Sequence, residues 1–363
     1  MINFTHGNLL KAPVEALVNT VNTVGVMGKG IALQFSRAYP DMYQQYVDAC
    51  RAGRVRMGHM HVYDTGGLAE GPRYIINFPT KSHWRANSKL SDIREGLEDL
   101  TALVRRFGIQ SIAVPPLGCG HGGLDWAKVR PMIVRAFEQL PGVDVRIYEP
   151  QGAPPAEDMP QRTSKPSLTI ARAVLLKLID RYKKGLIEPF VTLLEVQKLM
   201  YFMQEAGEPL KLSFVAERYG PYAANLRHQL NRMEGHYIVG YGDGTDSPEK
   251  MLDLKEGSVE KADDRLKGAD VVNKRMDRVS RLIDGFENPY GMELLATVHW
   301  VMVQSPDARK DPEVAVRKVH EWNARKARTM SAAQVKAAWE RLFKEDWQFD
   351  SASMSSDHEV ALR

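Results

Sequence analysis

The first 150 residues alternate between short apolar runs and longer stretches in which apolar residues recur at helical spacing. The apolar runs predict strands over 1–5, 16–21, 59–63, 74–78, 111–114 and 143–148. The helical spacing predicts helices over 31–39, 42–52, 92–107 and 126–140. Strands that alternate with helices are typical of an α/β domain, so we expect a mixed sheet with helices on both faces.

Polar residues stand near the starts of three of these helices. Their short side chains predict N-caps at Asp41, Ser91 and Asp125, because an oxygen at that position accepts a bond from a free N–H of the first turn. Asp125 could instead position a group near a bound ribose, but we favour the cap.

The pattern changes after residue 150. Five prolines between 150 and 166 predict a linker over 151–166. Residues 167–350 are then mostly helical in pattern, with a turn at 219–222, a short strand over 236–241 and helices over 169–183, 193–205, 223–233, 272–286, 291–305, 311–326 and 331–345. The polar residues 351–363 predict a flexible tail.

Composition fits two folded domains, since 363 residues exceed one ordinary domain. Residues 1–150 hold 17 Lys and Arg against 13 Asp and Glu, whereas residues 151–363 hold 32 of each. The surplus permits a polyanionic partner for the first domain. Two cysteines, the lack of a long apolar run and a strand-like start predict a cytoplasmic protein.

Two glycine-rich stretches each follow a predicted strand. The first, over residues 19–34, has Asn19 and Asn22 ahead of a Gly-Lys-Gly turn and a helical start, and the second spans 118–123. Glycines let backbone N–H groups approach a ligand closely, and a helix N-terminus favours negative charge. The strand ends of such a sheet lie at one edge, so we expect both stretches to form one site for a diphosphate.

Lys81 is the candidate nucleophile. It lies in a polar loop directly after the strand over 74–78. A lysine attacks only when it is neutral, so a site that uses it must lower its pKa by burial or by nearby positive charge. The alternative is an ordinary exposed lysine.

Other polar residues near these loops are open to more than one interpretation. Arg85 is either a phosphate contact or a solvated side chain, and His121 is either a general acid/base or a loop histidine. Cys119 has no obvious base beside it, which argues against a thiol nucleophile. His59 and His61 are two apart on a predicted strand and so point the same way, but no third ligand is evident. We expect neither a metal site nor a cofactor.

Four motifs together resemble the macrodomain, a fold that binds ADP-ribose. They are Gly7-Asn8-Leu9-Leu10, Val18-Asn19-Thr20-Val21-Asn22, Met27-Gly28-Lys29-Gly30-Ile31-Ala32 and Val114-Pro115-Pro116-Leu117-Gly118-Cys119-Gly120. The segment Asn77-Phe78-Pro79-Thr80-Lys81 is similar to the ADP-ribosyl glycohydrolase branch that uses a catalytic lysine.

The resemblance implies a set of site residues. The ADP-ribose-binding residues that it implies are Asn8, Leu9, Asn19, Asn22, Met27, Gly28, Gly30, Ile31, Thr80, Gly118, Cys119, Gly120, His121 and Gly122. Lys81 would attack the anomeric carbon of the distal ribose. The human relative pairs its lysine with an aspartate where this chain has Gly122.

With its helical second domain, the whole chain resembles antitoxins that oppose an ADP-ribosyltransferase toxin. This implies an enzyme that removes ADP-ribose from thymidine bases of single-stranded DNA, and a second domain that binds and neutralises the toxin. Residues 219–222, after the helix over 193–205, are similar to small antitoxin-type domains. The alternatives are a reader that binds ADP-ribose without turnover, or a hydrolase that acts on ADP-ribosylated protein.

Overall fold

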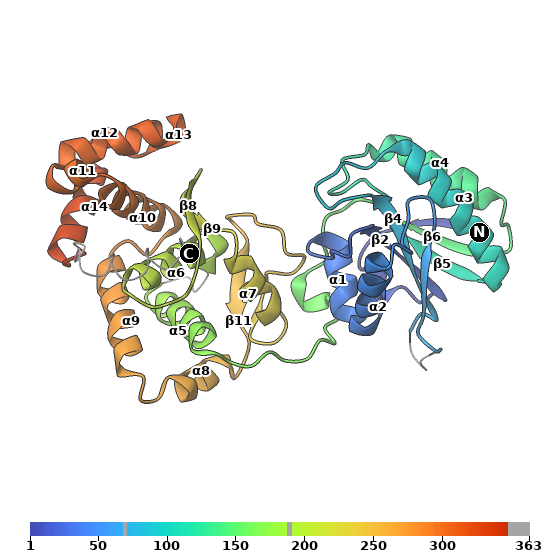
Figure 1. Ribbon diagram of the computed structural model, residues 1–363, viewed down its shortest axis with the longest axis horizontal. Helices are drawn as coiled ribbons and strands as arrows, with labels where there is room; N and C mark the ends of the chain where they lie inside the picture. Colours follow the sequence, from blue (N-terminus) through green and yellow to red (C-terminus); the bar gives the residue numbers. More distant parts are fainter. Residues whose placement is uncertain (68–70, 187–190, 348–363) are drawn as a thin grey trace. The chain divides into compact units, whose positions relative to one another are not determined.

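The computed structural model describes residues 1–67, 71–186 and 191–347 and divides the chain into two compact units (Figure 1). The first comprises Met1–Lys165 together with Tyr241–Thr245, and the second comprises Pro166–Gly240 and the described residues from Asp246 onward. No helix among the described residues is both long and apolar enough to cross a membrane. The predicted tail over 351–363 lies outside the described residues.

The first unit is built on a six-stranded sheet in the order β1-β6-β5-β2-β4-β3. Its strands are β1 (Ile2–Thr5), β2 (Ala16–Asn22), β3 (His61–Asp64), β4 (Tyr74–Lys81), β5 (Ser111–Val114) and β6 (Asp144–Tyr148). All neighbours pair in parallel except β3 and β4, which are antiparallel. The predicted mixed sheet is therefore confirmed.

Helices cover both faces of this sheet, as Figure 1 shows. They are α1 (Gly30–Ala38), α2 (Pro40–Arg51), α3 (Leu90–Phe107) and α4 (Trp126–Glu138). Alternate residues of β4 enter two separate cores: Phe78 packs with Ile93 of α3, whereas Ile75 packs with Phe35 of α1. The strand is buried on both faces, which explains its nearly continuous apolar run.

Three local predictions in this unit were wrong. Helix α2 begins at Pro40 with Tyr39 as its N-cap, so Asp41 lies in the first turn and is not the cap. Helix α3 begins at Leu90, which puts Ser91 inside it. Strand β3 begins at His61, so His59 lies before the strand. Proline fixes φ at a helical value and suits the first helical position, so α2 begins at Pro40, before the predicted start at residue 42.

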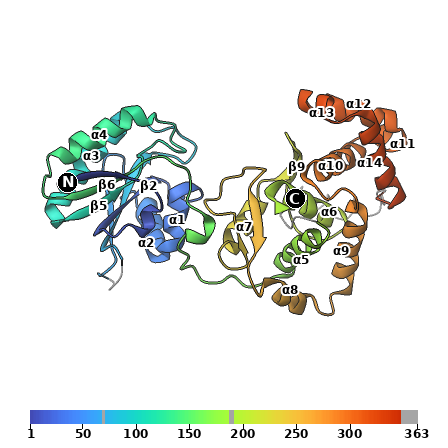
Figure 2. The ribbon, with the colours of Figure 1, turned by 180° about the vertical axis from the view of Figure 1, so that it is seen from behind.

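The second unit is mostly helical, as predicted, and its described residues include one three-stranded and one two-stranded sheet (Figure 2). Its helices are α5 (Ile170–Lys184), α6 (Leu193–Glu205), α7 (Leu226–Met233), α8 (Ser258–Leu266), α9 (Asp270–Ile283), α10 (Pro289–Gln304), α11 (Pro306–Lys310), α12 (Pro312–Trp322), α13 (Ala324–Thr329) and α14 (Ala332–Lys344). Its strands are β7 (Val191–Thr192), β8 (Phe214–Glu217), β9 (Gly220–Ala223), β10 (Ile238–Val239) and β11 (Met251–Leu254).

The sequence pattern missed several breaks in this unit. The helix predicted over 311–326 is two helices, because extended Asn323 ends α12 and caps α13 through its side chain. Residues 220–222 of the predicted turn belong to strand β9 of a hairpin with β8. Helix α8 was not predicted.

A buried ion cluster ties α10 to α13. Glu293 is 2% exposed and accepts bonds from Lys326 Nζ at 2.6 Å and from Arg325 Nη1 at 2.7 Å. Burial lowers the pKa of Lys326, and Glu293 opposes that shift. Each cation compensates a carboxylate that would otherwise be costly to bury.

Candidate active site

Contacts join three loops at the carboxyl ends of β2, β4 and β5. Thr23 Oγ1 donates to the Ser82 carbonyl at 2.8 Å, which links the β2–α1 loop to the β4–α3 loop. Ser88 N–H donates to the Gly122 carbonyl at 2.9 Å, which links the β4–α3 loop to the second glycine-rich loop. The three polar loops therefore meet at one edge of the sheet, as expected from the sequence.

Lys81 ends β4 and reaches the second glycine-rich loop. Its Nζ donates to the His121 carbonyl at 2.8 Å. Burial lowers the pKa of Lys81 below the ordinary lysine value of 10.5. Within the described ranges Lys81 forms no ion pair, because no carboxylate lies within 4.0 Å of its Nζ. A partly buried amine with no carboxylate partner can lose its proton more easily than a surface lysine.

The two glycine-rich stretches meet at His121. Gly30 opens α1 with a φ of +63°, and a Cβ placed on it would lie 3.4 Å from Cδ2 of His121. The N-terminus of α1 and the second glycine-rich loop thus face the same space, which is also where Lys81 points. Gly28 is exposed and Ile31 is half-buried beside this turn. This arrangement suits a diphosphate.

Tight packing fixes the shape of the second glycine-rich loop. A Cβ on Gly122 would lie 2.3 Å from Ser88 Oγ and 2.4 Å from the Gly118 carbonyl oxygen. Gly118 has a φ of +71°, and its Cβ would meet Leu124 at 2.8 Å. By contrast, no heavy atom lies within 4 Å of a Cβ on Gly120. An aspartate side chain therefore has no room at Gly122.

Several expected ligand residues form bonds that hold the loops in place. The Asn22 amide donates to the Val26 carbonyl at 2.6 Å, and its Oδ1 accepts from Val24 N–H at 3.0 Å. Thr80 is 3% exposed, and its hydroxyl bonds to the Val21 carbonyl. Asn19 is fully buried, and its Nδ2 donates to Asn77 Oδ1 at 2.9 Å. The asparagines that sequence reasoning assigned to a ribose thus have bonds within the protein.

The expected adenine end involves the segment after the sheet. Asn8 Oδ1 accepts from Leu10 N–H at 3.0 Å, and Asn8 Nδ2 donates to the Asp158 carbonyl at 2.8 Å. Lys11 pairs with the Asp158 carboxylate at 2.5 Å. Leu9 is 4% exposed and packs in the same core as Met27. Residue 158 falls in the predicted linker, and its contact with Asn8 was not foreseen.

The remaining candidate site residues differ in burial and in hydrogen bonding. Burial, together with Asp125, raises the pKa of Cys119 to about 11, so its thiol stays protonated at neutral pH. Asp125 Oδ1 accepts from Ala127 N–H at 3.0 Å and caps α4, as predicted. His121 and Arg85 are exposed. Among the described residues, no group of three or more His, Cys, Asp or Glu side chains could hold a metal ion.

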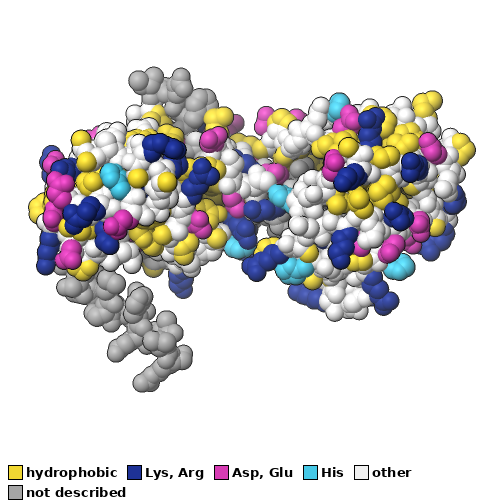
Figure 3. Space-filling model, turned by 90° about the horizontal axis from the view of Figure 1, so that it is seen from above, with side chains coloured by type: hydrophobic (Ala, Val, Ile, Leu, Met, Phe, Trp, Pro, Cys, Tyr) yellow, Lys and Arg dark blue, Asp and Glu magenta, His cyan; other side chains and the backbone are white. Residues whose placement is uncertain are grey.

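Ser88 and Thr23 are the positioning residues that sequence reasoning missed. Both lie in the polar loops, but each acts through a bond to a loop distant in sequence, so neither spacing nor residue type marks them. On the face that Figure 3 shows, basic, acidic and hydrophobic side chains are interspersed.

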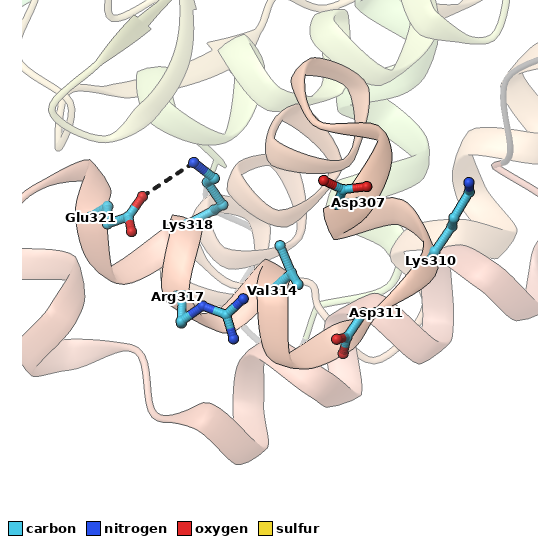
Figure 4. Close-up of a pocket in the computed structure, with 7 residues that line it drawn as sticks. All are labelled: Asp307, Lys310, Asp311, Val314, Arg317, Lys318 and Glu321. Atoms are coloured by element: carbon cyan, nitrogen blue, oxygen red, sulfur yellow. Dashed lines mark ion pairs between the residues drawn. The ribbon is translucent and has the colours of Figure 1, made fainter.

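The second unit carries an open groove along α11 and α12 (Figure 4). Its charged lining residues are Asp307, Lys310, Asp311, Arg317, Lys318 and Glu321. Lys318 pairs with Glu321 at 3.4 Å. With acidic and basic side chains in balance, the groove favours neither a polyanion nor a polycation.

The fold and the three joined loops define a macrodomain, and residues 18–133 match the Macro domain family. The chain belongs to the family of DNA ADP-ribosyl glycohydrolases. It is 48% identical over 354 residues to the DNA ADP-ribosyl glycohydrolase of Thermus aquaticus, a match that covers 96% of each chain.

Two further relatives match part of the chain. The solved macrodomain of Mycobacterium tuberculosis DarG is 59% identical, covers 42% of this chain and 99% of that one, and has a TM-score of 0.41. A Thermosipho africanus protein, described as a DNA ADP-ribosyl transferase–DNA ADP-ribosyl glycohydrolase fusion, is 34% identical over 163 residues, which is 41% of this chain and 42% of that protein.

Proposed function

We propose that the first unit removes ADP-ribose from thymidine bases of single-stranded DNA and that Lys81 is its nucleophile. The observation that carries this proposal is the bond from Lys81 Nζ to the His121 carbonyl, which holds the amine against the second glycine-rich loop with no carboxylate partner in the part of the chain that the structure describes. The enzyme family of the full-length relatives supports DNA as the carrier of the ADP-ribose.

The reaction has two steps. The neutral Lys81 amine attacks the anomeric carbon of the distal ribose, and the bond from that carbon to the base nitrogen breaks. The base leaves with the electron pair and takes up the proton that the amine loses. Water then attacks the same carbon, which releases ADP-ribose and regenerates the amine. A nucleophile divides one difficult displacement into two easier ones.

The glycine-rich loops would hold the diphosphate during both steps. The Gly30 N–H itself donates to the Asp243 carbonyl at 2.7 Å, so the donors would come from the first turn of α1 after Gly30 and from the backbone around Gly120. Binding a remote group firmly orients the reacting carbon toward the amine, which lowers the barrier. Asn22 contributes by fixing the loop ahead of Gly28.

A side-by-side assay tests this function. Wild-type protein is incubated with a single-stranded oligonucleotide that carries ADP-ribosylated thymidine, and separately with ADP-ribosylated protein. We expect release of ADP-ribose from the DNA, and Lys81→Ala should abolish release while leaving the Kd for ADP-ribose within about threefold. Turnover only on protein would favour a protein hydrolase, and no turnover on either substrate would favour an ADP-ribose reader.

For the second unit we propose that it binds and neutralises a DarT-type ADP-ribosyltransferase toxin. The support is that the chain matches a DNA ADP-ribosyl glycohydrolase over nearly its whole length and that another relative carries a DNA ADP-ribosyl transferase and a glycohydrolase in one protein. The full-length Lys81→Ala variant tests this role. This variant can no longer remove ADP-ribose from DNA, so any slowing of the toxin must come from binding. We expect it to slow the modification of DNA by the toxin, and failure to slow it would contradict the proposal.

A further inference from the structure

Trp84 is an exposed aromatic residue in the loop that follows Lys81. Its side chain is 42% exposed, although tryptophan is usually well buried. The guanidinium of Arg85 lies 4.4 Å from the centre of the Trp84 ring, and the His83 ring lies 5.2 Å away. The loop thus presents a flat apolar ring next to a positive charge, with much of the ring open to solvent.

Both ends of this loop are fixed to the candidate active site. Ser82 is held by the bond from Thr23, and Ser88 is held by its bond to Gly122. Since three residues span at most about 10 Å, Trp84 stays close to the Lys81 backbone. An exposed ring on a loop held at both ends is a preorganised contact surface.

The neighbouring β2–α1 loop extends this apolar rim. Val24 is 47% exposed and Val26 is 40% exposed. Asn22 Oδ1 accepts from the N–H groups of both valines, at 3.0 and 3.3 Å, and so fixes the loop that carries them. Exposed apolar residues that gather at the rim of a site point to a ligand that extends beyond it.

We propose that Trp84 and Arg85 form a stacking platform for a base of the DNA strand next to the ADP-ribosylated thymidine. The proposal rests on the function proposed above. ADP-ribose would fill the space between the glycine-rich loops, so the base joined to its anomeric carbon leaves past Lys81, and the adjoining nucleotides reach the rim. Every base has a face that stacks on tryptophan, and Arg85 adds a charge for the adjacent phosphate.

The test removes the bases and the ring separately. One substrate is a single-stranded oligonucleotide with ADP-ribosylated thymidine between two deoxyuridines; the other is the same molecule after enzymatic removal of both uracils, which leaves the phosphates. On the intact substrate, Trp84→Ala should lower kcat/KM by about ten- to hundred-fold, whereas Trp84→Phe should lose less. On the abasic substrate, wild type should already show that loss, and Trp84→Ala should add little to it.

Phe107→Ala is the matched control. Phe107 is 40% exposed and has the Arg106 guanidinium 4.9 Å from its ring, but it contacts Tyr74 at the opposite end of β4 from Lys81. This variant should not change kcat/KM on either substrate. Equal losses for Trp84→Ala on both substrates, or no loss on either, would overturn the platform while leaving the proposed hydrolase intact. Absence of wild-type turnover on the intact DNA would instead overturn the proposed function.

Discussion

The two units each contain a lysine with a lowered pKa, and they place it in opposite settings. Lys81 in the first unit donates to the His121 carbonyl, and Lys198 in the second donates to the Pro221 carbonyl at 2.6 Å. Burial, with the charge of Lys326, lowers the pKa of Lys198 to about 7. By pKa alone, Lys198 would be a strong candidate for a nucleophile.

The two lysines differ in how exposed their side chains are and in the residues that surround them. Lys198 is 2% exposed on the buried helix α6, beside Gln197, whose side chain bonds to both backbone groups of Ala223. Its ammonium therefore helps to hold strand β9 against the helix. Lys81 is half-buried and faces two glycine-rich loops that leave backbone groups near a ligand. Lys198 also lines a pocket of the second unit, but its own side chain is buried there. A lowered lysine pKa reports burial; the greater exposure of Lys81 and the glycine-rich loops beside it make Lys81 the candidate catalyst.

The same substitution at both lysines gives the largest expected contrast. Lys81→Met should lower turnover of ADP-ribosylated DNA by about a thousand-fold or more, because the nucleophile is gone. Lys198→Met should leave turnover within about twofold, since Lys198 acts only within the second unit. Single-turnover release of ADP-ribose measures both, with circular dichroism to verify folding. Loss of turnover in Lys198→Met with an intact fold would contradict the conclusion that only Lys81 takes part in turnover.

A second test asks whether the buried ion pair of Lys326 stabilises the second unit. Glu293→Gln leaves Lys326 and Arg325 without their carboxylate, so the second unit should lose about 3 kcal/mol of unfolding free energy. Glu313→Gln, which breaks an exposed pair with Lys336, should cost less than about 1 kcal/mol. Urea unfolding followed by tryptophan fluorescence measures both variants. Similar small losses in the two would show that the buried cluster contributes little.

Two glycines of one loop offer a matched pair in the first unit. Gly122→Ala drives a Cβ into Ser88 and the Gly118 carbonyl and should cost about 2 kcal/mol of stability, while Gly120→Ala meets no atom and should cost less than about 0.5 kcal/mol. Thermal unfolding of the full chain compares them. Equal shifts in Tm would mean that the loop is not held by this packing.

The smallest expected effect is on pH dependence. The attacking amine must be neutral, so turnover should rise with pH, and the lowered pKa of Lys81 should bring the midpoint of that rise below the ordinary lysine value of 10.5. Single-turnover rates from about pH 6 to about pH 11.5 trace this rise. A midpoint at or above the ordinary value would indicate that the pKa of Lys81 is not lowered in the working enzyme.

The sequence predicted the sheet, its covering helices and the meeting of the loops, because these depend on periodicity and on the common edge at which parallel strands end. It did not predict how the loops are held. Thr23, Ser88 and Asn22 act through bonds to partners that only the folded chain brings near. Thr80 was expected at the ligand and is buried between strands, since the alternation of β4 turns its side chain inward.

The contact between Asn8 and residue 158 bears on where an expressed fragment of the first unit should end. A fragment that ends at residue 150 would leave the Nδ2 of Asn8 and the Lys11 ammonium without their partners, and it would uncover the Tyr39 ring, which the Arg162 guanidinium faces at 5.5 Å. A fragment of the first unit should therefore extend at least through Lys165, and it would still lack Tyr241–Thr245, which belong to the same unit. The proline-rich segment is thus part of the folded first unit as well as the link to the second.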